Sequence, residues 1–576
     1  MCRVLWLVLV PFFVVAGGRS DLLKARTVIN DDGYQSNTAP AFAVPPPQPS
    51  EPTASPFVWG RTDTVGGTTY DWQASGPSGQ QIVTDARGVH VTWLYSAEMA
   101  NHADRNIRYN YYDFARQHWN FSDSGVSVFS ARSGFGNLDV NLTTGNAYIC
   151  SYVANGPVVA RDEAPGAGIF SECPGWPVTE GFTLPVMALT QSGKPHVALV
   201  PLFGSGLFYS RIDPWCTWSV PESIAPDLSS PTCLVQGSKH SGKVVITWVY
   251  GDPDATQPVE GYYVLSTNDG VTWAEPVQIP FPPAFTPGSE TLPTFHISGI
   301  SPLLDTNDEL HVVAAVAPII DGTTYIMPAE IWHWYQPVNE WSRVARRECD
   351  PANLGGGVGY NALYADRPTL CRGDHGEFIC VWEEFDSLNV EAATGLLRAG
   401  ICYGRSVNNG RDWSPTVLLT VPGTDSKRFP CIASRTWRDS FYIRCMTDQV
   451  AGFGVAPYGQ GPITNNPIVV FRDEPQIPTD VGEAPPTKTN RLTVSASPNP
   501  FRDRTVVGYD LPMVGHVCLR ICDVSGRTVA TLVDGILKPG IYRRDWQGPR
   551  ETPNGVFFLS LETAGRRESR KLILSR

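Results

Sequence analysis

The sequence contains no block of lysine or arginine, and charged residues make up only 17% of the chain. Its net charge of -12 at pH 7 makes nucleic acid and anionic membrane surfaces poor partners, because both repel an acidic protein. No apolar run of membrane-spanning length follows the first 20 residues. There is no CxxC pair, so the usual cysteine motif for zinc is missing. These absences direct attention to an acidic protein that works without nucleic acid, zinc or an integral membrane segment.

The N-terminus reads Met-Cys-Arg and then "VLWLVLVPFFVVAGG". One positive charge, a short apolar run and the small residues that follow it predict a secretory signal peptide over residues 1–18. A retained membrane anchor is the alternative, but the run is short and Pro11 interrupts it. We therefore expect a secreted or cell-surface protein. The proline-rich stretch that follows predicts an extended, disordered spacer over residues 19–57.

Cysteine is present at 13 positions, and removal of the signal peptide with Cys2 leaves twelve. Export to an oxidising compartment permits disulfides among them, although the pairing is not fixed by sequence. Cys371 and Cys380 flank one predicted hairpin turn, and Cys431 and Cys445 flank another. Both pairs are candidate cross-strand disulfides.

A repeat dominates the chain between residues 58 and 473. High Gly and Pro counts, 53 and 50, favour a turn-rich all-β protein, and 576 residues favour more than one domain. Apolar strands with alternating β-branched and aromatic residues recur about every 50 to 70 residues. Stacking such units in a ring would cover the faces of each sheet, which predicts a β-propeller. We count seven units, with six as the alternative, and expect the stretch near residues 58–72 to complete the last one. The recurring strands read "GVHVTWLY", "NAYICSYV", "KPHVALVPLF", "KVVITWVY", "ELHVVAAV", "EFICVWEEF" and "SFYIRCMT".

Two short motifs fall between the predicted third and fourth strands of their units. They read "STNDGVTW" from Ser266 and "SVNNGRDW" from Ser406. Both resemble the Asp-box of the sialidase-like (BNR) propeller superfamily, in which the box lies on the rim and away from the catalytic mouth. The polar side chains bond local backbone, glycine takes a positive φ, and we expect the tryptophan to pack back across its hairpin. The resemblance implies a structural role for Ser266, Asn268, Gly270, Trp273, Ser406, Asn408, Gly410 and Trp413.

The composition changes after residue 473. Residues 474–489 predict a linker, and residues 490–576 predict a small β-sandwich, because "HVCLRIC" and "GVFFLSL" alternate. This last segment is similar to C-terminal sorting domains of type IX secretion and to FlgD-type immunoglobulin-like domains. The similarity rests on motifs in family order, namely "SPNPF", "YDLP", "DVSGR", "WQG", "NGVFF" and "RKLIL". It implies export across an outer membrane, with the secretion machinery as a partner; an Ig-like module without a sorting role is the alternative.

Catalytic residues are harder to identify in the sequence. A catalytic sialidase needs three arginines, a Tyr nucleophile paired with Glu, and an acidic Asp. Arg428 in "RFP" and Arg367 in "DRP" would face the central funnel from neighbouring units, or they merely start inner strands. Glu383 or its neighbour Glu384 would act as a general acid or base, or would start a solvated loop. We recognise no third arginine and no Tyr–Glu pair.

Metal and cofactor sites are not indicated. His90, His196 and His311 take the same strand position in alternate units, which places them around the ring rather than together. "LDTNDEL" from Leu304 lacks the ligand spacing of a calcium loop. We therefore expect neither metal nor cofactor.

Three hypotheses for function remain open. The first is a non-catalytic module that binds glycan or protein, the second is a glycoside hydrolase or lyase with a carboxylate pair, and the third is a structural surface-layer component. A deep pocket holding Arg367, Arg428 and an acid would favour the enzyme. A shallow mouth with Tyr and Trp would favour glycan binding, and a flat uncharged mouth would favour the structural role.

Overall fold

The computed structural model describes residues 60–473 and 493–575, apart from residues 75, 123, 154–155, 176–182, 202–204, 230–231, 251–258, 284–293, 321–322, 351–352, 361, 456–458, 498, 500, 503, 512–514, 525–526, 538–539, 548–553 and 564–565. The predicted signal peptide, spacer and linker lie outside these residues. The chain forms two compact units, which divide between Pro475 and Gln476. The described residues form strands, turns and loops without an α-helix, and so contain no helix suited to crossing a membrane.

The first unit contains seven antiparallel sheets, each built on a path of four strands. From the inner to the outer strand, the first sheet is β2 (Ile82–Thr84), β3 (Gly88–Tyr95), β4 (Asn106–Asp113) and β5 (His118–Trp119), with β6 (Val126–Ser127) beside β4. The second is β7 (Ser133–Val140), β8 (Ala147–Val153), β9 (Gly156–Asp162) and β10 (Phe170–Pro174). The third is β11 (Thr183–Leu189), β12 (Pro195–Pro201), β13 (Ser205–Arg211) and β14 (Glu222–Ser229). The fourth is β15 (Cys233–Gly237), β16 (Val244–Tyr250), β17 (Glu260–Ser266) and β18 (Val277–Ile279).

The remaining three sheets follow the same plan. The fifth is β19 (Thr294–Leu304), β20 (Leu310–Ile320), β22 (Ala329–Tyr335) and β23 (Glu340–Arg347), with β21 (Thr323–Thr324) beside β20. The sixth is β24 (Ala365–Arg372), β25 (Phe378–Val390), β26 (Leu397–Ser406) and β27 (Val417–Leu418). The seventh is β28 (Ser426–Ile432), β29 (Tyr442–Asp448), β30 (Asn466–Arg472) and β1 (Arg61–Thr68).

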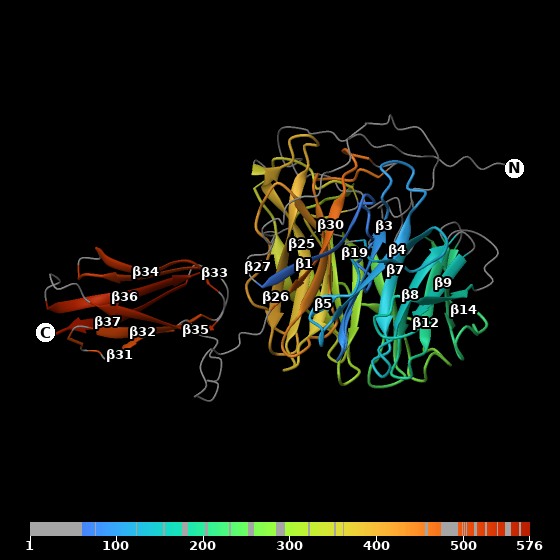
Figure 1. Cartoon of the computed structure of the whole chain (residues 1–576), viewed down its shortest axis with the longest axis horizontal. Helices are drawn as coiled ribbons and strands as arrows, with labels where there is room; N and C mark the ends of the chain where they lie inside the picture. Colours follow the sequence, from blue (N-terminus) through green and yellow to red (C-terminus); the bar gives the residue numbers. More distant parts are fainter. Residues whose placement is uncertain are drawn as a thin grey trace. The chain divides into compact units, whose positions relative to one another are not determined.

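The two ends of the first unit meet in the seventh sheet. β1 pairs antiparallel with β30, from Arg61 opposite Arg472 to Thr68 opposite Asn466 (Figure 1). Neighbouring inner strands contact one another from β2 through β7, β11, β15, β19 and β24 to β28, and β29 contacts β2. The sheets therefore form a closed ring, a β-propeller, and the predicted closure by the N-terminal stretch is confirmed. The structure describes seven sheets, whereas the sequence was compatible with either seven or six units.

Each recurring strand of the sequence is the second strand of its sheet, where both faces are covered by neighbouring sheets. All residues of β16 up to Val249 are buried, for example, which is why this strand reads as an almost continuous apolar run. His90, His196 and His311 lie near the starts of β3, β12 and β20, in three different sheets, and all three are fully buried. Within the described residues, no group of three or more His, Cys, Asp or Glu is arranged to hold a metal.

The antiparallel order gives the propeller two distinct faces. Second-to-third strand connections and the links to the next sheet lie on one, which we call the mouth face. First-to-second and third-to-fourth strand turns lie on the other, which we call the Asp-box face. The ends of β16, β25 and β29 therefore all point to the mouth face.

The second unit consists of two antiparallel sheets. One holds β31 (Thr493–Ser497), β32 (Arg504–Leu511) and β35 (Gly540–Gln547). The other holds β34 (Thr528–Leu537), β33 (Gly515–Cys522), β36 (Gly555–Thr563) and β37 (Arg566–Leu574). Val507, Leu519, Trp546 and Leu559 share one core between the sheets, so this unit is a small β-sandwich. Its relation to Ig-like sorting domains stays a prediction.

The predicted disulfides are wrong. Cys371, Cys380, Cys431 and Cys445 are free and buried, and the described disulfide joins Cys173 to Cys216. Cys371 lies opposite Ile379 and Cys431 lies opposite Arg444, so each predicted partner is displaced by one residue. Side chains one residue apart point to opposite faces of a sheet, and the two thiols of each pair accordingly lie in different cores.

Candidate functional site

The two Arg-and-Pro motifs form bulges near the mouth ends of inner strands. In β24 the register shifts between Asp366 and Thr369, and in β28 it shifts between Arg428 and Cys431. The bulged residues Arg367 and Phe429 have φ angles of 53° and 55°, a left-handed conformation that is uncommon outside glycine. By register, Arg367 corresponds to Phe429, and Arg428 corresponds to Asp366. The two motifs therefore occupy the same position in their strands, and this alignment places their arginines one residue apart.

The bulges bring both arginines to Glu383 on β25. Arg367 Nη1 contacts one carboxylate oxygen of Glu383. The other oxygen accepts hydrogen bonds from Arg428 Nε at 3.2 Å and from the backbone N–H of Phe429 at 2.9 Å. All three charged side chains are at most 2% exposed. The predicted residues Arg367, Arg428 and Glu383 therefore meet, as an enclosed ion-pair cluster between the sixth and seventh sheets.

Glu383 is not the start of a solvated loop, because it lies within β25, opposite Asp366 on one side and Ile401 on the other. Glu384 points the other way and contacts Arg347 at 2.6 Å, as expected for neighbours on a strand. Burial raises the pKa of Glu383, but the charges of Arg428 and Arg367 outweigh it and hold the pKa below its usual value. Glu383 is thus ionised at neutral pH, which suits an ion pair better than a general acid.

A segment of the mouth face covers this cluster. We call Val450–Val455, which follows β29, the cap. Its Phe453 ring lies 5.5 Å from the Arg428 guanidinium and stacks on Trp72, with ring centroids 5.1 Å apart and an interplanar angle of 16°. The cap residues Phe453 and Val455 belong to the core of the first unit. Arg367, Arg428 and an acid therefore do not line an open pocket.

Two further carboxyl groups lie beneath the cap. Asp71, which follows β1, and Asp448, at the end of β29, are both almost fully buried. Burial raises the pKa of Asp71 to about 7, although N–H groups of the cap and the charge of Arg428 oppose it. Burial and the neighbouring Asp71 charge raise the pKa of Asp448 well above its ordinary value. This carboxyl pair was missed in the sequence, because its members are 377 positions apart (448 minus 71).

The centre of the propeller is narrow. The cavity along its axis has a volume of about 30 Å³, enough for one or two water molecules and too small for a sugar ring. Residues of all seven inner strands or their approaches line it, among them Ser78, Asn137, Val186, Leu234, Ser301, Thr369 and Cys431.

The Asp-box residues lie at turns between third and fourth strands, as predicted. Ser266 ends β17 and Ser406 ends β26, and each hydroxyl accepts the N–H of the glycine four residues later, at 3.0 and 2.9 Å. Gly270 and Gly410 have φ angles of 69° and 78°. Asn268 and Asn408 each accept the N–H four residues on at 3.0 Å, which closes the turn.

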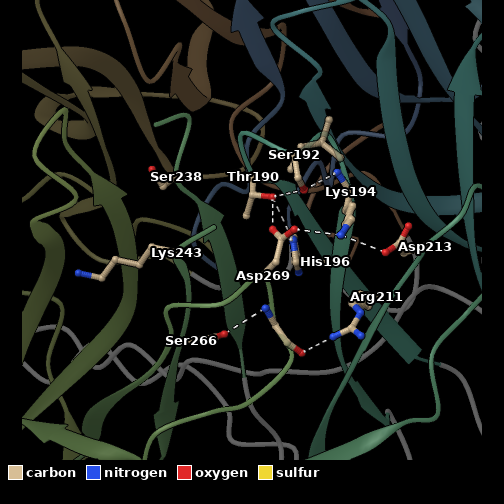
Figure 2. Close-up of polar contacts among 12 residues, drawn as sticks. Thr190, Ser192, Lys194, His196, Arg211, Asp213, Ser238, Lys243, Ser266 and Asp269 are labelled. Carbon is tan, nitrogen blue, oxygen red and sulfur yellow. Dashed lines mark hydrogen bonds and ion pairs between the residues drawn. The ribbon is translucent and has the colours of Figure 1, made fainter. Parts of the chain in front are cut away.

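Each box also holds the preceding sheet. Figure 2 shows Asp269 between Thr190, which donates a hydrogen bond at 2.5 Å, His196 and Lys194, while Arg211 donates to the carbonyl of Gly270 at 3.0 Å. Burial raises the pKa of Asp269, but bonds from His196, Thr190 and Ser192 outweigh it, so the net shift is strongly downward. The network joins the third and fourth sheets.

Both tryptophans reach the preceding sheet, and Trp413 also donates to the carbonyl of Gly410 in its own turn at 3.0 Å. Trp273 contacts Tyr209 of the third sheet, with ring centroids 4.7 Å apart. Trp413 Nε1 donates to Ser342 Oγ of the fifth sheet at 3.1 Å. The boxes therefore act as clasps between sheets, because their side chains reach the neighbouring sheet in the ring.

An aromatic platform lies at the mouth end of the fourth sheet. We define it as Trp248, Tyr250, Glu260 and Tyr262. Trp248 pairs with Tyr262 and Tyr250 pairs with Glu260 across β16 and β17, so all four share one face. The rings of Trp248 and Tyr262 stack at 5.7 Å with an interplanar angle of 10°, and Tyr262 Oη donates to Glu260 Oε2 at 2.5 Å. Tyr250 is 42% exposed. This platform was not predicted from the sequence. The signal for it in the sequence was the Trp-x-Tyr end of "VVITWVY".

Comparison with known proteins gives structural likeness only. No family model and no curated protein matches the chain. A PL25 ulvan lyase structure is 12% identical, covers 68% of this chain and 94% of its own, and gives a TM-score of 0.45. A thermostable family-43 glycoside hydrolase is 12% identical over 53% of this chain and 96% of its own, with a TM-score of 0.28. An α-L-arabinanase of Penicillium chrysogenum is 10% identical over 50% of this chain and 92% of its own, with a TM-score of 0.30.

These TM-scores are below 0.5, and the similarity carries no functional argument. The sialidase-like resemblance and the sorting-domain resemblance remain predictions, since no family model matches either segment.

Proposed function

We propose that this chain is an exported glycan-binding β-propeller, and that the aromatic platform of the fourth sheet is its binding surface. The observation that carries the proposal is the exposed Tyr250 opposite Glu260 across the strand pair, beside the Tyr262–Glu260 hydrogen bond. A sugar ring offers an apolar face for an aromatic side chain and hydroxyl groups for a carboxylate, and the platform provides both within one strand pair.

Contacts within the platform hold Tyr262 in place. Trp248 is only 3% exposed and stacks with the Tyr262 ring, and the phenol of Tyr262 donates to Glu260. A side chain that is already ordered loses little conformational entropy on binding, so the interaction retains more of its affinity. The rival position for chemistry, the Glu383 cluster, is enclosed and holds an ionised carboxylate, which favours binding over hydrolysis.

The test measures binding of the full-length mature protein to a panel of neutral and acidic polysaccharides, first by affinity electrophoresis and then by calorimetry on the strongest ligand. We expect Tyr250→Ala and Glu260→Ala each to weaken binding about tenfold, since loss of one aromatic or charge-assisted contact removes about 1–2 kcal/mol.

The chain provides a matched control. Tyr335 donates to Glu309 Oε2 at 2.5 Å in the fifth sheet, the same pair type on the Asp-box face. Tyr335→Ala and Glu309→Ala should leave affinity unchanged. Equal losses from both pairs, or release of reducing ends without retention, would count against a binding surface at the platform.

Export through the second unit belongs to the same proposal. Its support is the set of sorting-domain motifs on a separate two-sheet unit. Expression in a host with a type IX system, with and without residues 490–576, tests it; we expect the truncated protein to stay inside the cell envelope.

A further inference from the structure

Two carboxyl groups hold the cap, one at each end. Asp448 Oδ1 accepts the N–H of Val450 at 3.2 Å, at the start of the cap. Asp71 Oδ2 accepts the N–H of Gly454, near its end. Asp71 precedes the first sheet and Asp448 ends β29 in the seventh, so the pair sits where the ring closes.

The carboxyl pair is enclosed and only partly compensated. Asp71 Oδ1 and Arg428 Nη2 are buried and make no hydrogen bond within the described residues. The charged group that acts on both carboxyls is Arg428 of β28, and Arg428 is already bound to Glu383 of β25, which also holds Arg367 of β24. Arg444 of β29 donates to Gln73 Oε1 at 2.6 Å instead. Two guanidinium groups, those of Arg367 and Arg428, therefore serve three carboxyl groups, so two negative charges on the pair cannot both be neutralised.

We propose that Asp71 and Asp448 form a proton-operated latch that holds the cap Val450–Val455 closed over Arg428 and Glu383. While Asp71 carries its proton, its charge is not buried, and the cap stays bound by both side chains. When the proton leaves, a carboxylate is left in a dry site, and its charge also acts on Asp448. This cost is relieved when the cap lifts, because water then reaches both groups, and the same movement unstacks Phe453 from Trp72 and uncovers Arg428.

The sign of the pH dependence follows from the raised pKa values. The folded protein keeps protons at pH values where an unfolded chain, with carboxyl pKa values near 4, has released them. The closed state is therefore most favoured at low pH and loses that advantage progressively as the pH rises from about 4 to about 7, the pKa of Asp71.

Hydrogen exchange of the mature chain, read by mass spectrometry from pH 5.5 to 8.5 and corrected for intrinsic exchange rates, tests the latch. We expect the protection of cap amides to fall at least tenfold between pH 5.5 and about 7 and then to level off, while β16 amides keep theirs. Asp71→Asn removes the group whose pKa is about 7 and preserves the side-chain shape, so its cap should stay protected throughout. Asp439→Asn, an exposed turn residue whose carboxylate pairs with His375, is the control and should behave as the unaltered chain.

Constant cap protection across this pH range in the unaltered protein would overturn the latch. So would an identical fall in Asp71→Asn. If Asp71→Asn does not fold, the profile of the unaltered chain decides by itself. This inference does not rest on glycan binding: platform variants leave the cap profile unchanged if both are right.

Discussion

Because the Asp-box packs into the neighbouring sheet, a single methyl group added at Gly410 should destabilise the protein. In Gly410→Ala, the new Cβ would lie 2.1 Å from Cε1 and 2.5 Å from Nδ1 of His333. That ring has little room to move, because it is buried and its Nε2 bonds to His311 Nδ1 at 2.9 Å. The substitution also places alanine at a φ of 78°. We expect the strained backbone conformation to lower the free energy of unfolding by about 1 kcal/mol. Overpacking against His333 should lower it by a further ~1–3 kcal/mol.

Gly395→Ala separates these two contributions. Gly395 has a φ of 69°, yet a Cβ built there meets nothing within 4 Å. In Gly395→Ala, only the backbone conformation therefore lowers the free energy of unfolding. Equilibrium urea unfolding of both variants, followed by tryptophan fluorescence, should show Gly410→Ala less stable than Gly395→Ala by about 1–3 kcal/mol. Equal free energies of unfolding would refute the claim that the box is packed into the neighbouring sheet.

Three other predictions concern the cluster and the cysteines. Glu383→Gln leaves Arg367 and Arg428 buried without their carboxylate, so we expect it to lower the free energy of unfolding by about 3–5 kcal/mol. Glu384→Gln changes a partly exposed ion pair and should lower the free energy of unfolding by about 1 kcal/mol. Urea unfolding measures both values. Because the pKa of Glu383 is depressed in the folded state, its contribution is present above the unfolded-state pKa near 4 and is lost as the pH falls below it, so the difference between Glu383→Gln and the unaltered chain should shrink in acid. Iodoacetamide in denaturant without reductant should modify Cys371, Cys380, Cys431 and Cys445, while Cys173 and Cys216 should react only after reduction, and peptide mapping that finds either predicted pair linked would contradict the structure.

Much of the fold is determined locally and is therefore readable in the sequence. The second strands carry an apolar pattern that depends only on their position in a stack of sheets, and every one of the seven was placed correctly. Ser266, Gly270 and their counterparts Ser406 and Gly410 fix their turns through bonds over four residues. The closing strand could be predicted as well, because an incomplete last unit requires a partner from the other end of the chain.

What the sequence could not decide depends on register and on distance in space. One residue of register separates Arg367 from Arg428 and places Cys371 and Cys380 in different cores, and a bulge leaves no trace that pattern reading detects. Burial of Glu383 follows from the meeting of two bulged strands, so a residue that reads as a solvated loop becomes the centre of an ion-pair cluster. Asp71 and Asp448 are neighbours only because the ring closes between them. The sequence determined the repeating strands and turns through short-range bonding, and only tertiary closure decided which charges face one another.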